Sequence, residues 1–125
     1  DYEEGTWTPN LGTVTGGVVN GEYRKIGKTV FVQCFVSLVS HGQSSTMNIS
    51  GLPFSSLSNK YASFAIGNYR FLNLDGGYNQ VMINMAGTTM TLREGGDNAN
   101  WQNVEWSQAS NDFAMYISGT YMSIA

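Results

Sequence analysis

The sequence has few charged residues, a single cysteine and two prolines. Only 12% of its 125 residues are charged, about half the roughly 25% found in an average soluble domain. One cysteine cannot form an intramolecular disulfide, and a chain of this length can bury an ordinary core without disulfides or metals. We therefore expect one domain over residues 1–125. Because the chain does not begin with Met, we expect it to be a piece of a longer polypeptide.

The charge and the hydrophobic runs exclude two classes of partner. The net charge is −3, whereas proteins that bind nucleic acid carry a Lys/Arg stripe, and here Arg24, Lys25 and Lys28 form the one basic cluster. The longest apolar-rich run, 30–39, is too short to span a bilayer. The acidic opening does not have the basic and hydrophobic regions of a signal peptide. We predict no nucleic-acid binding and no membrane insertion.

Period-two alternation predicts an all-β fold. Between residues 29 and 40 every even position is apolar, which is typical of a strand with one face in a core. Further strands are predicted at 18–26, 46–49, 61–66, 80–86, 88–93, 103–107 and 113–124, with Gly119 as a bulge in the last. Tight turns are expected at Gly27 and Gly87. Short strands at this spacing favour an antiparallel β-sandwich or jelly roll with little helix.

The odd positions of the 29–40 strand are also partly apolar. Phe31, Phe35 and Val39 share this second face with polar residues. Together with the low charge, such a face needs a cover that the sandwich does not provide. We therefore predict that it lies in an interface between copies of the chain.

No catalytic or metal-binding constellation is visible. His41 stands alone in a polar stretch, so neither a catalytic triad nor a zinc site has the partners it requires. Cys34 lies on the apolar face of its strand and is interpreted as inert packing. Asp75 and Asp97 could donate oxygens to calcium, but no regular Asp/Asn loop surrounds them. We expect no enzymatic activity and no cofactor, and we assign no metal ligand, with calcium left as an open alternative.

Aromatic residues among amides give the best indication of a binding site. Trp101 and Trp106 flank Asn103 and Glu105, and indole faces with amides and a carboxylate suit sugar rings. Tryptophans five apart fall on opposite faces of a regular strand, so at least one is expected in the core unless the segment bends. A second candidate loop region includes Tyr69 and Tyr78, with loop packing as the alternative. Trp7 is expected to anchor the entering segment to the sandwich.

Several segments resemble the C-terminal domain of bacteriophage tail fibres and tailspikes. The opening, residues 1–9, reads DYEEGTWTP, and residues 21–32 read GEYRKIGKTVFV. ISGLPF at 49–54 and ISGTY at 117–121 fit the same pattern, whereas 68–112 matches only in strand rhythm. The resemblance implies a β-sandwich that trimerises at the fibre tip, belongs to the extracellular virion tail, and often recognises host-surface sugars. It carries over no catalytic residue.

From the residues and the resemblance together we predict a homotrimeric domain that attaches the virion to host-surface polysaccharide. The predicted carbohydrate-binding residues are Trp101, Asn103, Glu105, Trp106, Tyr69 and Tyr78, and the predicted trimer interface comprises Phe31, Phe35 and Val39. Because sugar binding is expected to rest on an aromatic platform and hydrogen bonds, we expect it to be insensitive to salt. The alternative is a purely structural trimerisation or folding module, with recognition or enzymatic activity in upstream domains.

Overall fold

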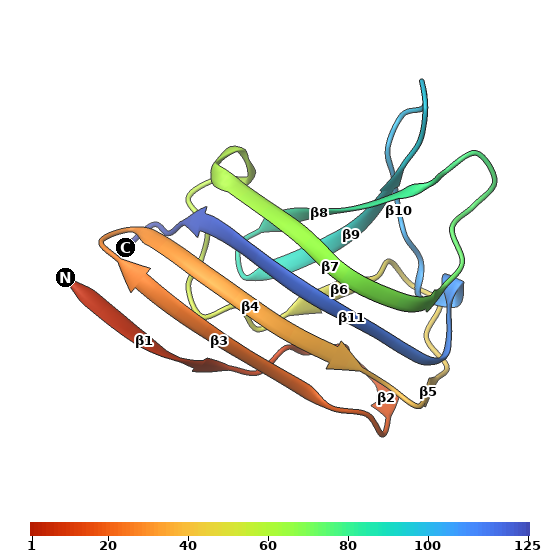
Figure 1. The fold of residues 1–125 in the computed structure, drawn as a ribbon, viewed down its shortest axis with the longest axis horizontal. Helices are drawn as coiled ribbons and strands as arrows, with labels where there is room; N and C mark the ends of the chain where they lie inside the picture. Colours follow the sequence, from red (N-terminus) through yellow and green to blue (C-terminus); the bar gives the residue numbers. More distant parts are fainter.

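The protein is a sandwich of two antiparallel sheets, as the alternating pattern predicted. The computed structural model describes all residues from 1 to 125. One sheet has five strands in the order β1-β3-β4-β11-β7 and forms the front layer of Figure 1. Its strands are β1 (Tyr2–Trp7), β3 (Val19–Ile26), β4 (Thr29–Ser37), β11 (Ala109–Met122) and β7 (Ala62–Leu72).

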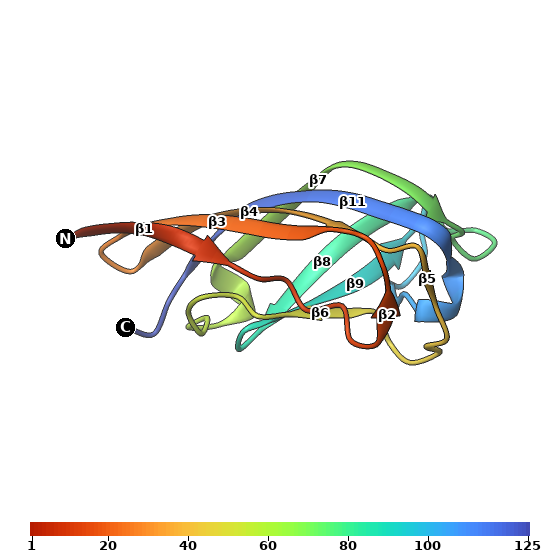
Figure 2. The same ribbon diagram turned by 90° about the horizontal axis from the view of Figure 1, so that it is seen from below.

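The second sheet lies behind the first, and Figure 2 shows the two layers from the side. β8 pairs along one edge of β9, while β6 and β10 pair with successive parts of the other edge. These strands are β6 (Asn48–Ser50), β8 (Gln80–Ala86), β9 (Thr89–Gly95) and β10 (Gln102–Asn103). A two-stranded ribbon, β2 (Val14–Thr15) with β5 (Ser40–His41), lies at one end. Two short 3₁₀ helices, η1 (Asn59–Tyr61) and η2 (Trp106–Gln108), complete the fold.

A single hydrophobic core fills the space between the sheets. Its largest fully buried side chains include Tyr121 and Phe113 from β11, and Met85 and Leu92 from the second sheet. Trp7 is also buried and donates its indole N–H to the Glu22 carbonyl at 3.2 Å, so it holds the entering strand against the sandwich. The core members are Trp7, Leu11, Val30, Val32, Cys34, Val36, Leu38, Met47, Ile49, Leu52, Met85, Met90, Leu92, Val104, Trp106, Ala109, Phe113, Met115, Ile117 and Tyr121.

Two predictions about the strands were wrong, and one strand was missed. Of the segment predicted as a strand over 103–107 only Asn103 belongs to β10, and the chain then turns into η2, where Glu105 and Gln108 form a capping box. Gly119 is not at a bulge. The pairing of β11 with β7 is irregular between Ala109 and Ala114, and again between Tyr116 and Ile117, where β7 carries the extra residue Gly67. The edge strand β1 was not predicted at all.

The two termini lie at the same end of the sandwich. The tight turn at Gly27 and the start of β1 are also at this end, on the left of Figure 1. The β7–β8 loop, which contains Asp75, lies at the opposite end, on the right. No helix is long and apolar enough to cross a membrane.

Candidate functional sites

The outward face of the five-stranded sheet carries a strip without formal charge. On β4, on β11 and on β7 as far as Gly67, the outward residues are aromatic, small or neutral polar, and the register sets them side by side. Arg70, further along β7, borders them beside Phe35 and Tyr116. Glu22 and Arg24 on β3 border the strip on one side. We call the following residues the outer strip: Phe31, Gln33, Phe35, Ser63, Ala65, Gly67, Tyr116, Ser118 and Thr120.

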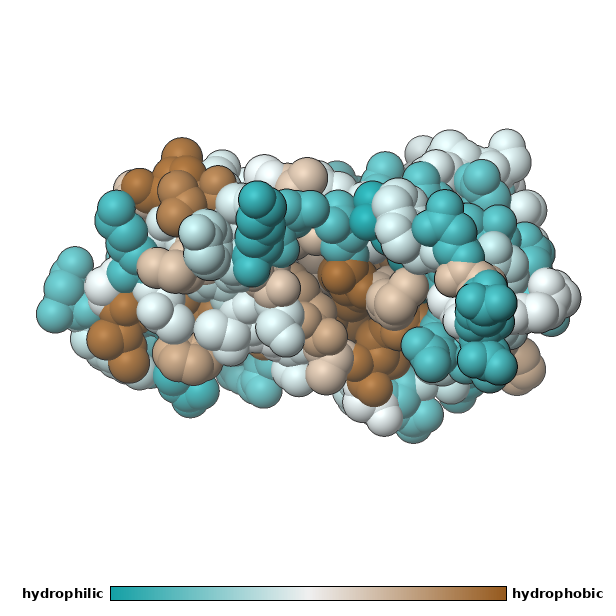
Figure 3. Space-filling model, turned by 90° about the horizontal axis from the view of Figure 1, so that it is seen from above, coloured by the Kyte–Doolittle hydropathy of each residue, from teal (hydrophilic) through white to brown (hydrophobic).

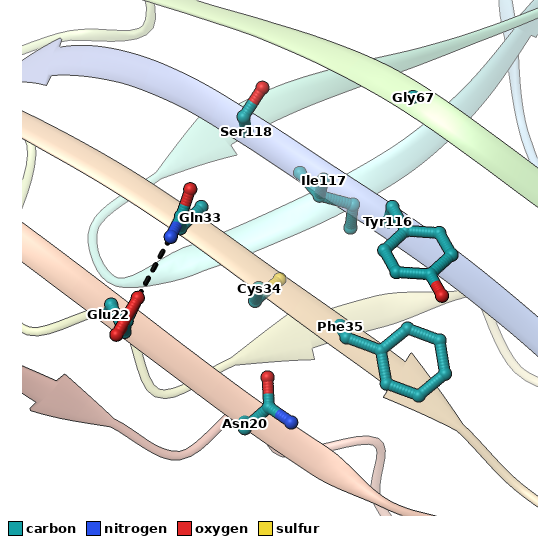
Figure 4. A pocket seen from close by; sticks show the side chains of 9 residues that line it. All are labelled: Asn20, Glu22, Gln33, Cys34, Phe35, Gly67, Tyr116, Ile117 and Ser118. Carbon is teal, nitrogen blue, oxygen red and sulfur yellow. Dashed lines mark hydrogen bonds between the residues drawn. The ribbon is translucent and has the colours of Figure 1, made fainter.

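A groove of about 350 Å³ runs across the outer strip. The rings of Phe35 and Tyr116 lie at its wall with centroids 4.7 Å apart (Figure 4). On its other side the Gln33 amide donates to the Glu22 carboxylate at 2.8 Å. Because Gly67 lacks a side chain, β7 leaves the space beside Tyr116 open. The strip therefore presents aromatic surface and a hollow into which a side chain or a small ligand can fit.

The predicted interface residues do not all lie on this strip. Phe31, 44% exposed, and the half-buried Phe35 both project from it. Val39 lies beyond the end of β4, where its side chain packs beside Gly16. Val39 therefore lies outside the outer strip because β4 ends at Ser37, although it remains 51% exposed next to the buried Leu38.

The buried carboxylate of Glu94 binds the loops at the end of the second sheet that includes β10. Glu94 on β9 has no exposed surface. Its Oε1 accepts the Asp75 backbone N–H at 3.1 Å and the Gln108 amide at 3.2 Å. Its Oε2 accepts the Gln102 amide at 2.6 Å, and the same Gln102 nitrogen donates to the Asp75 carboxylate at 2.9 Å. These bonds tie the 73–79 loop, β10 and η2 to one strand.

The exposed Trp101 lies on the outward side of β9 and β10. Asn103 pairs with Arg93 in register, and the Arg93 Nε donates to the Asn103 Oδ1 at 3.3 Å. The guanidinium lies 3.6 Å from the centroid of the Trp101 ring, which is 50% exposed. Tyr78 donates its hydroxyl to the Asn100 carbonyl at 3.0 Å, which links its loop to the same segment. Trp101, Asn103 and Tyr78 are thus brought to one end of the molecule.

The other predicted carbohydrate-binding residues lie elsewhere. Trp106 is 2% exposed and packs edge-on against His41, so it cannot offer a ring face to a sugar. Glu105 is exposed but caps η2. Tyr69 is in β7 rather than in a loop, and it lines a hollow beside Phe35. Arg93 was not among the candidates, because cross-strand pairing places it at the site.

The remaining reactive side chains are engaged in packing. The Nε2 of His41 contacts the Ala109 carbonyl at 2.8 Å, and its Nδ1 accepts the Gln43 N–H at 3.0 Å. Burial raises the pKa of the Cys34 thiol to about 12. Burial likewise raises the pKa of Tyr121 to about 12, against a lowering by its hydrogen bond with Phe54. No three His, Cys, Asp or Glu side chains lie together in a way that could hold a metal ion.

Figure 3 shows the molecule from the side of β7 and β8. The brown apolar areas on this side are separated by white and teal ones, and the right-hand loop end is mostly white and teal. This side therefore offers no continuous apolar surface of its own.

Comparisons with known proteins relate the fold to one solved structure. The sequence matches no protein-family model and no curated protein. The crystal structure of the Dettilon tailspike protein superposes on 97% of this chain with a TM-score of 0.76 and 20% sequence identity. The chain spans 24% of the length of that protein's chain. The molecule thus shares its sandwich fold with part of a tailspike protein.

Proposed function

We propose that this chain is a domain of a bacteriophage tailspike or tail fibre, that it assembles as a homotrimer, and that it attaches the virion to carbohydrate on the host surface. In this proposal it acts in the extracellular part of the virion tail by binding and not by catalysis. The likeness to part of the Dettilon tailspike protein supports the structural half of the proposal. The opening motif at residues 1–9 supports the same assignment.

The observation that carries the proposed trimer is the uncharged outer strip. Interface cores are depleted in charged residues and enriched in aromatic ones. The residues of the strip carry no formal charge and include Phe31, Phe35 and Tyr116, and Arg70 of β7 lies at its border. Covering each phenylalanine would contribute roughly 1.5–3 kcal/mol relative to exposure. A neighbouring copy can insert side chains into the groove beside Phe35.

The proposed carbohydrate site is the loop end around Trp101. The Arg93 guanidinium lies against one face of the indole, and Trp101 as a whole is 50% exposed, which leaves ring surface for a sugar to contact. Asn103 and Tyr78 add polar groups from neighbouring segments. The two termini lie at the other end of the sandwich, so a preceding part of the fibre would not cover this surface.

A glycan array with the assembled protein tests the binding half of the proposal. We expect binding to one or more bacterial surface glycans, and we expect Trp101→Ala to abolish it with assembly and thermal unfolding unchanged. Tyr61→Ala is the matched control, because Tyr61 is equally exposed on η1 and lies outside the site. It should bind as the unaltered protein does.

No binding to any glycan on the array, with intact trimers, would favour the alternative function. In that case the domain would be a structural trimerisation module, and recognition would belong to other parts of the fibre. Unfolding of the Trp101→Ala variant, with binding unaffected by changes at Asn103, would instead move the receptor site away from the loop end.

A further inference from the structure

The outward face of the four-stranded sheet carries amides, hydroxyls, one methionine and one charge. Its register sets Asn84 and Asn48 on either side of Thr91, and sets Met82 and Asn103 on either side of Arg93. We call the following outward residues the amide face: Asn48, Ser50, Gln80, Met82, Asn84, Thr89, Thr91, Arg93 and Asn103. Arg93 is the one ionised side chain among them.

The Arg93 guanidinium has no carboxylate partner. The one ion pair in the molecule joins Arg24 and Glu4, on the other sheet. Arg93 makes a single hydrogen bond, from Nε to Asn103. No buried side-chain nitrogen in the molecule lacks a hydrogen-bond partner, so the two Nη atoms of this half-buried residue reach solvent. The Arg93 guanidinium is therefore held against the indole of Trp101, and its Nη edge is open to solvent.

The nearby acids do not neutralise this cation. Glu94 points to the opposite side of β9, where amides and a backbone N–H satisfy its carboxylate. Asp75 is bound to Gln102 on that same inner side. Asp97 and Glu105 are exposed in the flanking segments and make no ion pair with Arg93. The guanidinium edge thus remains available to an external anion.

We propose that Arg93 and Trp101 form a subsite for a carboxylate-bearing sugar, such as a hexuronic acid unit of a polysaccharide. A guanidinium presents a planar fork that matches a carboxylate. The free Nη edge would take the carboxylate, and the Asn103 amide nitrogen, which donates to no protein group, would take a ring hydroxyl. The next unit along the chain can stack on the exposed face of Trp101. This inference rests on the proposed carbohydrate function and replaces the expectation that salt matters little.

Binding of matched acidic and neutral oligosaccharides tests this subsite. Trigalacturonate and trigalactose would be titrated into the ¹⁵N-labelled protein by NMR, with acetate and inorganic phosphate as further arms. We expect trigalacturonate to bind at least about tenfold tighter than trigalactose, because charge-assisted hydrogen bonds are the stronger kind. It should shift the Arg93 Nε–H and Trp101 indole N–H signals. We expect its affinity to fall as salt is raised.

Two arginine variants separate the subsite from general charge effects. Arg93→Gln should lose the preference for trigalacturonate. Arg70→Gln should keep it, because Arg70 also lies beside an aromatic ring, that of Phe71, but on the other sheet. Should Arg93→Gln fail to fold, the signal shifts in the unaltered protein decide the matter.

The outcomes separate the subsite from the proposed function. Equal binding of the two sugars, or shifts that avoid Arg93 and Trp101, would overturn the subsite and leave the carbohydrate function standing. Binding of acetate and phosphate as tightly as trigalacturonate would also overturn it, because the site would then hold any small anion. No binding of any sugar here or on the array would overturn both.

Discussion

Gly119 and Gly67 show how closely the strands of the large sheet are fitted at the scale of single residues. A Cβ on Gly119 would meet the ring of Phe64 and would lie 2.7 Å from the Ser63 carbonyl oxygen. A Cβ on Gly67 would find only the Cβ of Tyr116, at 3.8 Å. The first glycine is therefore required by the close approach of β7, whereas the second occupies open space.

We expect Gly119→Ala to destabilise the fold by about 1–3 kcal/mol, the usual cost of inserting volume into a packed site. Gly42→Ala is the control, because Gly42 lies outside the outer strip and a Cβ there would meet nothing within 4 Å, and it should change the free energy of unfolding by less than about 0.5 kcal/mol. Urea denaturation of the two variants measures the difference. Equal effects of the two substitutions would show that the β11–β7 contact is looser than the structure indicates.

Cys34 and Tyr121 give the fold an alkaline limit. Both have a pKa of about 12 in the folded protein, above the ordinary values of 9.0 and 10.0. Their contribution to stability is complete below pH 9. It is lost as the pH rises toward 12, because the unfolded chain releases these protons at a lower pH than the folded protein does. Between the two pKa values of each group, the free energy of unfolding falls by about 1.4 kcal/mol per pH unit.

Chemical denaturation between pH 8 and pH 12 should show this decline, and Cys34→Ala should delay its onset to about pH 10, where Tyr121 begins to contribute. The substitution will also lower stability at pH 8, so the comparison is between slopes and not between absolute values. Identical slopes in the two proteins between pH 9 and pH 10 would contradict the burial of the thiol.

At the scale of elements, β10 connects the buried Glu94 to the exposed Trp101. Gln102 faces inward to Glu94 and Asp75, and Asn103 faces outward to Arg93. A two-residue strand has little stability of its own. We therefore expect the position of Trp101 to depend on the hydrogen bonds from the Gln102 amide to the carboxylates of Glu94 and Asp75.

Gln102→Ala should free the loop end without unfolding the sandwich. Removing a donor from a buried carboxylate typically costs about 1–3 kcal/mol. We expect that loss in urea denaturation, together with faster amide hydrogen exchange in the 73–79 loop and β10. Gln80→Ala, at an exposed position of β8, should change neither. Unchanged exchange in the Gln102 variant would mean that other contacts hold the loops.

Strong alternation made β4 and β8 predictable from sequence, whereas the second half of β7, beyond residue 66, was missed. β4 and β8 are close to their predicted ranges because one face of each is packed in the core. β1 lacked this signal, since five of its six residues are not buried and backbone pairing with β3 defines it. At the candidate site the sequence placed Trp101 and Asn103 together but omitted Arg93. That pairing depends on the register between β9 and β10, which local spacing does not contain.

At the scale of the whole molecule, the two ends of the sandwich have different surroundings in the proposed fibre. The termini lie at one end, and β10, which directly follows Trp101, lies toward the other. A trimer would present three Trp101 surfaces, and linked sites raise avidity without new contacts. Each site then needs only about millimolar affinity, near −4 kcal/mol, which a shallow platform can supply.

The outer strip can be tested by making it polar. We expect the double variant Phe31→Ser, Phe35→Ser to remain folded but to be monomeric, because both side chains project from the sandwich and not into its core. Circular dichroism would establish folding, and light scattering the mass. Tyr61→Ser, an exposed aromatic outside the strip, should leave assembly intact. Full assembly of a folded double variant would place the interface on another face.

The most direct measurement of the central proposal is the mass of the unaltered protein in dilute solution. Sedimentation velocity or light scattering at micromolar concentration should give a particle of three times the 13.7 kDa subunit mass, and this mass should persist on further dilution. A particle of 13.7 kDa at micromolar concentration would contradict the assignment of the uncharged outer strip to a trimer interface.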